Sequence, residues 1–266
     1  MYLGEYQSME LVKNKRIGKI LFIVEGSKHE FSLIKKIFED ILGYKRIEKR
    51  RTKTTYYQSQ TDSHSVVAVI NTKTSNIGSI NENEYLDVIF QELLERYDFD
   101  VNNAAIYYLF DRDPISNTDS KLILNLIRTL KNSRENENNL LGGMLILSYP
   151  SIEAYEVSNF YDATYLQSAE IGDNVKKFIA SNAKNISLNK ISAESIVHAC
   201  NELLNYATEH KITLDFDNFA NANERIFLEE EQYYQKNHSY FLLSMMSCVL
   251  LDLGILKEPL LFTPEE

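Results

Sequence analysis

Short apolar runs alternate with longer amphipathic stretches over residues 19–148 of the chain. Four runs rich in β-branched residues have the length and pattern of buried strands, namely residues 19–24, 66–70, 104–110 and 144–148. Between them, apolar residues recur every three or four positions, as on one face of a helix, over residues 28–42, 84–97 and 119–132. This alternation predicts an α/β fold, with a parallel sheet covered by helices on both faces.

The pattern becomes helical from about residue 152 onward. Helices are predicted over residues 152–160, 173–181, 192–209 and 221–253. We therefore expect an α/β domain of residues 1–160, followed by a helical region of residues 161–266. Residues 241–251 are apolar nearly all round, so we expect either a buried segment or an interface, for a homodimer or for a larger partner. The helical region is interpreted as a packing and assembly module.

Composition places the chain among globular proteins. Of its 266 residues, 44% are hydrophobic and 25% are charged, which is enough apolar material for a core. The two cysteines, Cys200 and Cys248, lie in apolar-periodic stretches and are expected to be buried free thiols rather than disulfide or zinc ligands. Apolar runs are too short to span a membrane, and the N-terminus has no signal-peptide pattern, so we expect a cytoplasmic protein.

Charge is distributed unevenly along the chain. Residues 1–60 carry a net charge of +6 and the rest carry −16, which excludes a uniformly basic nucleic-acid binder but allows a local basic patch. Residues 45–53 hold the densest positive charge, from Lys45, Arg46, Lys49, Arg50, Arg51 and Lys53. These side chains can neutralise phosphates, and Tyr56 and Tyr57 can stack on bases. A solvated loop or a protein interface is the alternative interpretation.

Acidic residues follow three of the four predicted strands. Glu25 ends the first strand and Glu30 lies in the next helical turn, Asp111 and Asp113 follow the third strand, and Glu153 follows the fourth, after Ser148 and Ser151. The carboxyl ends of parallel strands share one edge of a sheet, which is where ligands bind in open α/β folds. Helix capping explains some of these residues individually, but not the full set.

Converging carboxylates repel one another unless a cation lies between them. Ligands that are all oxygen favour Mg²⁺ or Mn²⁺ over Zn²⁺. His198, His210 and His238 share no metal-ligand spacing and are interpreted as incidental. One metal ion would be held by Glu25, Asp111 and Asp113, and a second would lie near Glu30 and Glu153. Lys28, beside Glu25, is a candidate contact to a scissile phosphate, with a solvent-facing lysine in the first helical turn as the alternative. Arg112 is expected to pair with the flanking aspartates.

These residues resemble the Toprim domain, over about residues 18–160. The similarity rests on residues 20–26 (ILFIVEG), on Asp111-Arg112-Asp113, and on Ser148, Pro150 and Glu153. The spacing is most similar to that of the RloB and OLD-type Toprim nucleases of bacterial phage defence. The resemblance implies a Toprim-like Rossmannoid sheet, a metal-dependent endonuclease acting on DNA or RNA (tRNA included), and a partner ATPase.

Two further implications concern residues outside the quoted motifs. Because the chain lacks a G-x-x-x-x-G-K-[ST] loop, any ATPase would be a separate subunit. Some relatives also carry a downstream catalytic lysine, for which Lys176, Lys177, Lys184 and Lys190 are the candidates.

Other functions compete with the nuclease hypothesis. A dehalogenase-like phosphatase would carry its Asp-x-Asp after the first strand, and a receiver domain would need a fifth strand followed by lysine. A third alternative is a non-catalytic subunit that binds nucleic acid or an ATPase. The acidic set favours a magnesium-dependent phosphoryl-transfer enzyme over a scaffold.

Overall fold

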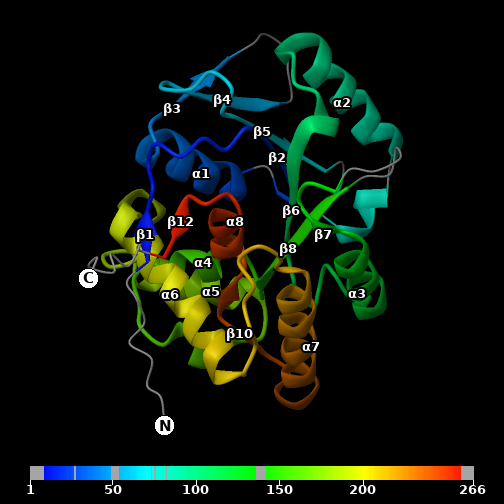
Figure 1. Cartoon of the computed structure of the whole chain (residues 1–266). Coiled ribbons are helices and arrows are strands. Elements are labelled where there is room, and N and C mark those ends of the chain that lie inside the picture. Colours follow the sequence, from blue (N-terminus) through cyan, green and yellow to red (C-terminus); the bar gives the residue numbers. More distant parts are fainter. Residues whose placement is uncertain are drawn as a thin grey trace, which may run out of the picture.

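A computed structural model describes residues 9–26, 28–48, 54–72, 74, 76–81, 83–135 and 142–258 (Figure 1). Its strands are β1 (Glu10–Leu11), β2 (Lys19–Val24), β3 (Tyr44–Ile47), β4 (Thr55–Ser59), β5 (Val66–Asn71), β6 (Ala104–Asp111), β7 (Lys131–Asn132), β8 (Gly143–Tyr149), β9 (Ser168–Ala169), β10 (Tyr240–Phe241), β11 (Leu243–Ser244) and β12 (Leu256–Lys257). Its α-helices are α1 (His29–Lys35), α2 (Asn83–Tyr97), α3 (Ser120–Thr129), α4 (Glu153–Ser158), α5 (Gly172–Ser181), α6 (Ala193–Glu209), α7 (Ala220–Asn237) and α8 (Met246–Asp252). A π-helical segment, η1 (Lys36–Ile41), continues α1, and four short 3₁₀ turns complete the described elements.

The central sheet confirms the α/β class but is mixed rather than wholly parallel. Strands β8, β6, β2 and β5 run parallel in that order, as predicted. The prediction of a purely parallel sheet is wrong at both margins, because β4 and β3 extend it antiparallel beyond β5, and β11 and β7 pair antiparallel with β8. Strands β3 and β4 were missed because their polar residues obscure the alternation of apolar and polar positions that identifies a half-buried strand.

Helices cover both faces of the sheet. Leu21 of β2 is in register with Ala68, which is in register with Tyr56, so these three side chains share one face. On that face Tyr56 stacks on Tyr97 of α2, with ring centroids 4.6 Å apart. Phe22 points to the other face and contacts Phe38 of η1 at 5.8 Å between centroids. The four parallel strands are therefore buried on both sides, as their continuous apolar runs predict.

The prediction of one long helix over residues 221–253 is wrong. Helix α7 ends at Asn237, and His238 has a left-handed backbone with φ of 53°. The chain then forms β10, which pairs with β9, and β11, which pairs with β8, before α8 begins at Met246. Two other helices are shorter than predicted. The one over residues 152–160 spans Glu153–Ser158, and the one over residues 119–132 ends at Thr129 and is followed by β7.

The apolar segment 241–251 belongs to the core. Leu243 is 3% exposed and Met246 is fully buried, and the surrounding side chains join the same apolar cluster as the sheet. An all-round apolar pattern is typical of an element buried on all sides. The interpretation of this segment as a surface for a homodimer or larger partner is therefore wrong, because its side chains face the interior.

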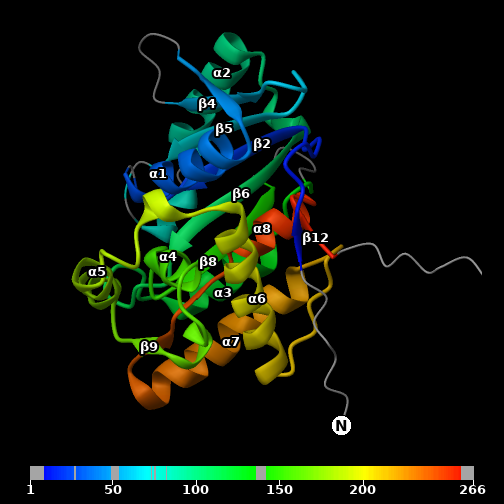
Figure 2. The same cartoon turned by 90° about the vertical axis from the view of Figure 1, so that its left-hand side faces the viewer.

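Residues on both sides of position 160 contribute to one apolar cluster. Strand β11 adds to the central sheet, and β12 pairs with β1 near the N-terminus. Figure 2 shows α5 and β12 on opposite sides of the molecule. Both cysteines are buried free thiols, as expected. Among the residues that the structure describes, no helix combines the length and apolar character needed to cross a bilayer.

Candidate active site at the carboxyl edge of the sheet

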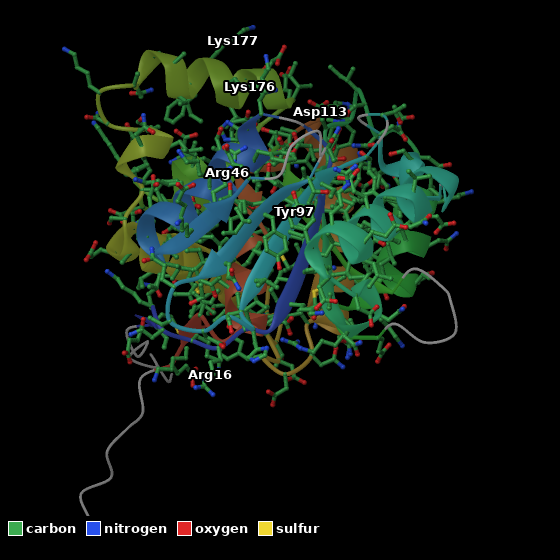
Figure 3. The ribbon with its side chains drawn as sticks, turned by 90° about the horizontal axis from the view of Figure 1, so that it is seen from above. Arg16, Arg46, Tyr97, Asp113, Lys176 and Lys177 are labelled. Atoms are coloured by element: carbon green, nitrogen blue, oxygen red, sulfur yellow. The ribbon has the colours of Figure 1, made fainter. Side chains whose placement is uncertain are left out.

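The carboxyl ends of β2, β6 and β8 bring the predicted acidic residues to one edge of the sheet. We call Glu25, Glu30, Asp111, Asp113 and Glu153 the acidic rim. Glu25 directly follows β2, Asp111 ends β6, and Glu153 begins α4 after β8. Glu25, Glu30 and Glu153 are buried, and Asp111 and Asp113 are half-buried. Figure 3 shows Asp113 close to Lys176 at one side of the molecule, opposite Arg16.

Backbone amides hold the rim carboxylates in place. Asp111 N–H donates to Glu25 Oε2 at 2.9 Å, and Ile152 N–H donates to Asp111 Oδ1 at 2.8 Å. Gly26 N–H donates to Glu30 Oε1 at 2.9 Å. For Asp111 and Glu30, no hydrogen bond within the described part of the chain reaches the second carboxylate oxygen. These oxygens are therefore available to a ligand.

Two glycines allow the rim to be this compact. A Cβ on Gly26 would lie 2.5 Å from Glu30 Oε2, and a Cβ on Gly172 would lie 2.9 Å from Ser151 Cβ. Gly172 N–H also donates to Asp113 Oδ2 at 3.1 Å, which places the start of α5 against the acidic rim. Gly26 belongs to the ILFIVEG motif, whereas nothing in the sequence singles out Gly172, whose contact with Asp113 emerges only from the structure.

Burial and mutual repulsion make ionisation of the rim costly. Burial raises the pKa of Glu25 to about 6, and Glu30 adds to the rise, against the lowering effect of the hydrogen bond from Asp111. Burial also raises the pKa of Asp111 well above its usual value, with further contributions from Glu25, Glu153 and Glu30. Carboxylates far apart in the sequence are thus electrostatically coupled, as the strand-end argument predicts.

Several buried polar atoms at and around Glu153 lack a hydrogen-bond partner. Glu153 Oε2, Ser151 Oγ and His29 Nε2 are buried without a hydrogen bond in the described part of the chain. His29 lies between two carboxylates, with Nδ1 4.0 Å from Glu153 Oε1 and Nε2 3.5 Å from Glu156 Oε2. Burial raises the pKa of Glu156, although His29 opposes the rise. Sequence reasoning missed both His29 and Glu156.

Lys176 is the lysine that the fold brings to the rim. Its Nζ lies 4.0 Å from Glu153 Oε1 and 3.8 Å from Asp173 Oδ1. Burial lowers its pKa, but nearby carboxylates, led by Glu153 and Asp111, raise it above its ordinary value. Lys28 is exposed, and within the described residues no ion pair joins it to a rim carboxylate. Lys177 is also exposed, and Lys190 donates to the backbone carbonyl of Lys184 instead.

Arg112 points away from the two aspartates that flank it, contrary to expectation. Its buried guanidinium donates from Nε to Glu231 Oε1 at 2.7 Å and from a terminal nitrogen to the carbonyl of Asn117 at 2.6 Å. Ser120 and Tyr240 also hydrogen bond to Glu231. The rim therefore receives no compensating charge from Arg112, and α7 is tied to the loop that carries Asp111 and Asp113.

Asn117 links this buried ion pair to the rim. Its Nδ2 donates to the carbonyl of Asp111 at 2.8 Å, its Oδ1 accepts from Ile77 N–H at 2.9 Å, and its side chain also hydrogen bonds to Glu25. On the other side, burial raises the pKa of Glu230 to about 8. Glu231, which accepts from Arg112 Nε at 2.7 Å, is the counter-charge of the arginine.

The predicted basic segment is only partly described. Lys45 and Arg46 are exposed on the edge strand β3, and Arg46 Nε lies 3.7 Å from Glu48 Oε1. Lys49, Arg50, Arg51 and Lys53 lie outside the described residues. Because β3 and β5 both pair antiparallel with β4, β3 runs toward the same edge of the sheet as the rim. Charged residues on an edge strand also prevent sheet-to-sheet association.

No protein-family model matches the chain, and neither a curated protein nor a solved structure matches it.

The raised pKa of Glu25 leads to a pH-dependent prediction for the metal-free protein. The pKa of Glu25 is about 6 in the folded protein and 4.5 in an unfolded chain, so the folded state binds the proton more tightly. The stabilisation that results is fully present below pH 4.5 and is lost as pH rises through about 6. Glu25→Gln should therefore raise the free energy of unfolding by roughly 2 kcal/mol at pH 8 and leave it unchanged at pH 4. Urea denaturation in the presence of a chelator measures both values; equal stability at pH 8 would contradict the assignment.

A second prediction compares two ion pairs made by α7. Glu231→Gln removes the counter-charge of a buried arginine and should cost about 3–5 kcal/mol of unfolding free energy. Glu224→Gln breaks the exposed pair with Arg128, at 2.7 Å, and should leave the free energy of unfolding nearly unchanged, because solvent screens this pair. Chemical denaturation of both variants checks the difference, and similar losses would show that the buried pair does not anchor the loop.

Proposed function

We propose that the acidic rim binds Mg²⁺ or Mn²⁺ and that the protein is a metal-dependent nuclease that hydrolyses phosphodiester bonds in DNA or RNA. One observation carries this proposal. Acidic side chains from three strand ends lie together, with raised pKa values for Glu25 and Asp111, while the arginine beside them is paired elsewhere. A hard divalent cation with oxygen ligands relieves that repulsion.

The donor set fits a magnesium-type ion. Every rim ligand is an oxygen, and Glu153 Oε2 and Ser151 Oγ are buried without partners among the described residues. Within the same part of the chain, no three rim carboxylates bring oxygen atoms within 4.8 Å of one another. This favours an ion held by one or two carboxylates at a time, with water and phosphate oxygens completing its shell, as is usual for Mg²⁺. One ion would lie among Glu25, Asp111 and Asp113, held by one or two of them at a time, and a second would lie near Glu30 and Glu153.

The chain supplies further groups for a phosphodiester. A bound divalent ion supplies a more acidic water and neutralises phosphate charge. Lys176, held beside Glu153, is positioned to stabilise negative charge that develops on phosphate oxygens. Both Lys28 and Lys176 are exposed, but only Lys176 is paired with a rim carboxylate in the described part of the chain, so we assign to it the contact to a scissile phosphate. The fixed backbone amides keep the carboxylates in place without a ligand, which reduces reorganisation during the reaction.

The Toprim resemblance supports the nuclease class and adds a biological context. It rests on Glu25, on Asp111 and Asp113, and on Glu153, all of which belong to the rim. By the same resemblance, we propose an effector of bacterial anti-phage defence, acting in the cytoplasm under the control of a separate ATPase.

The metal site is tested by titration of the full-length protein with Mn²⁺, followed by electron paramagnetic resonance. Asp111→Asn should weaken binding at least tenfold, because it removes a charge at the centre of the rim. Glu209→Gln, an exposed acid at the end of α6, is the matched control and should leave binding unchanged. Absence of Mn²⁺ binding by the wild type, with nucleic acid present or absent, would refute the site.

Cleavage is tested on plasmid, single-stranded DNA and total tRNA with Mg²⁺ or Mn²⁺, with and without a genomically neighbouring ATPase. Glu25→Gln and Lys176→Met should each lower the rate at least about a hundredfold. Metal binding without cleavage of any of the three substrates would instead support a non-catalytic subunit.

The basic segment makes a separate prediction about substrate binding. Reversing Lys45 and Arg46 to Glu should weaken nucleic-acid binding and reduce the slope of log K against log salt by about 0.9 for each duplex phosphate that is no longer neutralised. The charge-matched control reverses Lys211 and Lys236, which are exposed elsewhere. Fluorescence anisotropy at several salt concentrations gives the slope. If both double variants give the same slope of log K against log salt, Lys45 and Arg46 do not contact phosphates, and their role is to prevent sheet-to-sheet association at the edge strand.

A further inference from the structure

A second cluster of metal-ligand residues lies at the other end of α4. This helix begins with Glu153 at the acidic rim and ends at Ser158, after which Asp162 lies against α6. His198 and Glu202 are four residues apart on α6 and so share one helix face. A ring nitrogen of His198 and one oxygen each from Asp162 and Glu202 all lie within 4.8 Å of one another. We call these three residues the α6 triad.

The imidazole of His198 is oriented as in a metal ligand. Its Nδ1 lies 2.7 Å from the carbonyl oxygen of Ser158 and donates to it. This leaves Nε2 facing Asp162 Oδ1 at 2.8 Å. A backbone carbonyl behind the ring is the usual device that fixes the tautomer of a metal-binding histidine. Ligands about 2.0–2.1 Å from a tetrahedral ion lie about 3.3 Å apart, so the present separation is that of a hydrogen bond and the two atoms would move apart by roughly half an ångström to admit the ion.

Glu202 is held in a fixed position with one oxygen open to a ligand. The residue is 5% exposed, and both of its hydrogen bonds, from Thr164 N–H at 2.6 Å and from Thr164 Oγ1 at 2.8 Å, reach Oε2. Within the described part of the chain, no hydrogen bond reaches Oε1. Because Oε1 is not one of the enclosed oxygens that lack a partner in the described part of the chain, it is open to water or to a ligand. His198 alone, even as an imidazolium, leaves two carboxylates with one positive charge.

We propose that Asp162, His198 and Glu202 bind a zinc-class divalent transition metal, at a site separate from the acidic rim. One imidazole nitrogen with two carboxylate oxygens suits Zn²⁺ and similar ions, whereas the all-oxygen rim suits Mg²⁺. A divalent ion with a neutral imidazole balances both carboxylates. The side chain of Asp162 is 95% exposed, so water can occupy the remaining coordination position. The ion would clamp the end of α4 and its following loop to α6.

The test is isothermal titration calorimetry of the full-length protein with Zn²⁺, after treatment with a chelator and dialysis. The wild type should bind one equivalent at this site in the presence of millimolar Mg²⁺. His198→Gln and Asp162→Asn should each weaken that binding at least tenfold. Because the side chain of Asp162 is exposed, its variant tests the site without threatening the fold. His210→Gln, on the same region of chain but stacked on Tyr206, is the matched control and should bind normally.

The rim variant Asp111→Asn distinguishes the two sites. It should retain the zinc equivalent, with X-ray absorption showing imidazole nitrogen and oxygen ligands, while losing Mn²⁺ at the rim. Absence of zinc binding by the wild type would overturn the proposal and leave a plain ion pair between His198 and Asp162. Zinc binding that persists unchanged in both His198→Gln and Asp162→Asn would also overturn it. Neither result depends on whether the protein cleaves nucleic acid.

Discussion

The buried ion pair between Arg112 and Glu231 determines how the acidic edge of the sheet is built. Arg112 stands between two aspartates, and a guanidinium there would ordinarily neutralise them. Glu231, Ser120 and the carbonyl of Asn117 instead draw the arginine to the opposite side of the loop. A buried ion pair contributes little net stability compared with apolar packing, but losing one partner is costly, so it fixes one arrangement over others. The arrangement it fixes leaves Asp111 and Asp113 facing Glu25 without a counter-charge from Arg112.

This constraint also explains why the C-terminal region is inseparable from the sheet. Glu231 lies on α7, the strand β10 that follows supplies Tyr240, and Tyr240 both hydrogen bonds to Glu231 and lies under the Arg112 guanidinium, 5.3 Å from the ring centroid. Strand β11 then pairs with β8, the strand that leads to Glu153. Elements distant in sequence therefore hold two of the three acidic strand ends. Packing of this kind stabilises geometry at the rim that the carboxylates, left to their mutual repulsion, would oppose.

The sequence predicted what depends on local pattern and missed what depends on tertiary partners. Four parallel strands and the acids after them follow from apolar runs that end abruptly, and the structure places those acids together. The apolar pattern does not predict the π-helical segment, the edge strands or the break in the helix at His238. A left-handed residue or an antiparallel pairing leaves the spacing of apolar residues almost unchanged. Lys176 could not be separated from three other lysines, since only the packing of α5 against Asp113 through Gly172 distinguishes it. Arg112 was assigned to its sequence neighbours because Glu231 is 119 residues away.

Helix α4 joins two clusters whose chemistry differs. The first residue of the helix, Glu153, belongs to the acidic rim, whose members are all carboxylates and which His29 flanks. At the other end of the helix, the carbonyl of Ser158 orients the imidazole of the α6 triad. In the proposals made above, the rim takes a magnesium-type ion and the α6 triad a zinc-class ion, because hard and borderline cations prefer these two environments in opposite order. A helix of six residues is too short to be stable alone, and its position depends on what holds its two ends. The α6 triad is therefore placed to influence where Glu153 lies, without contributing an atom to the rim itself.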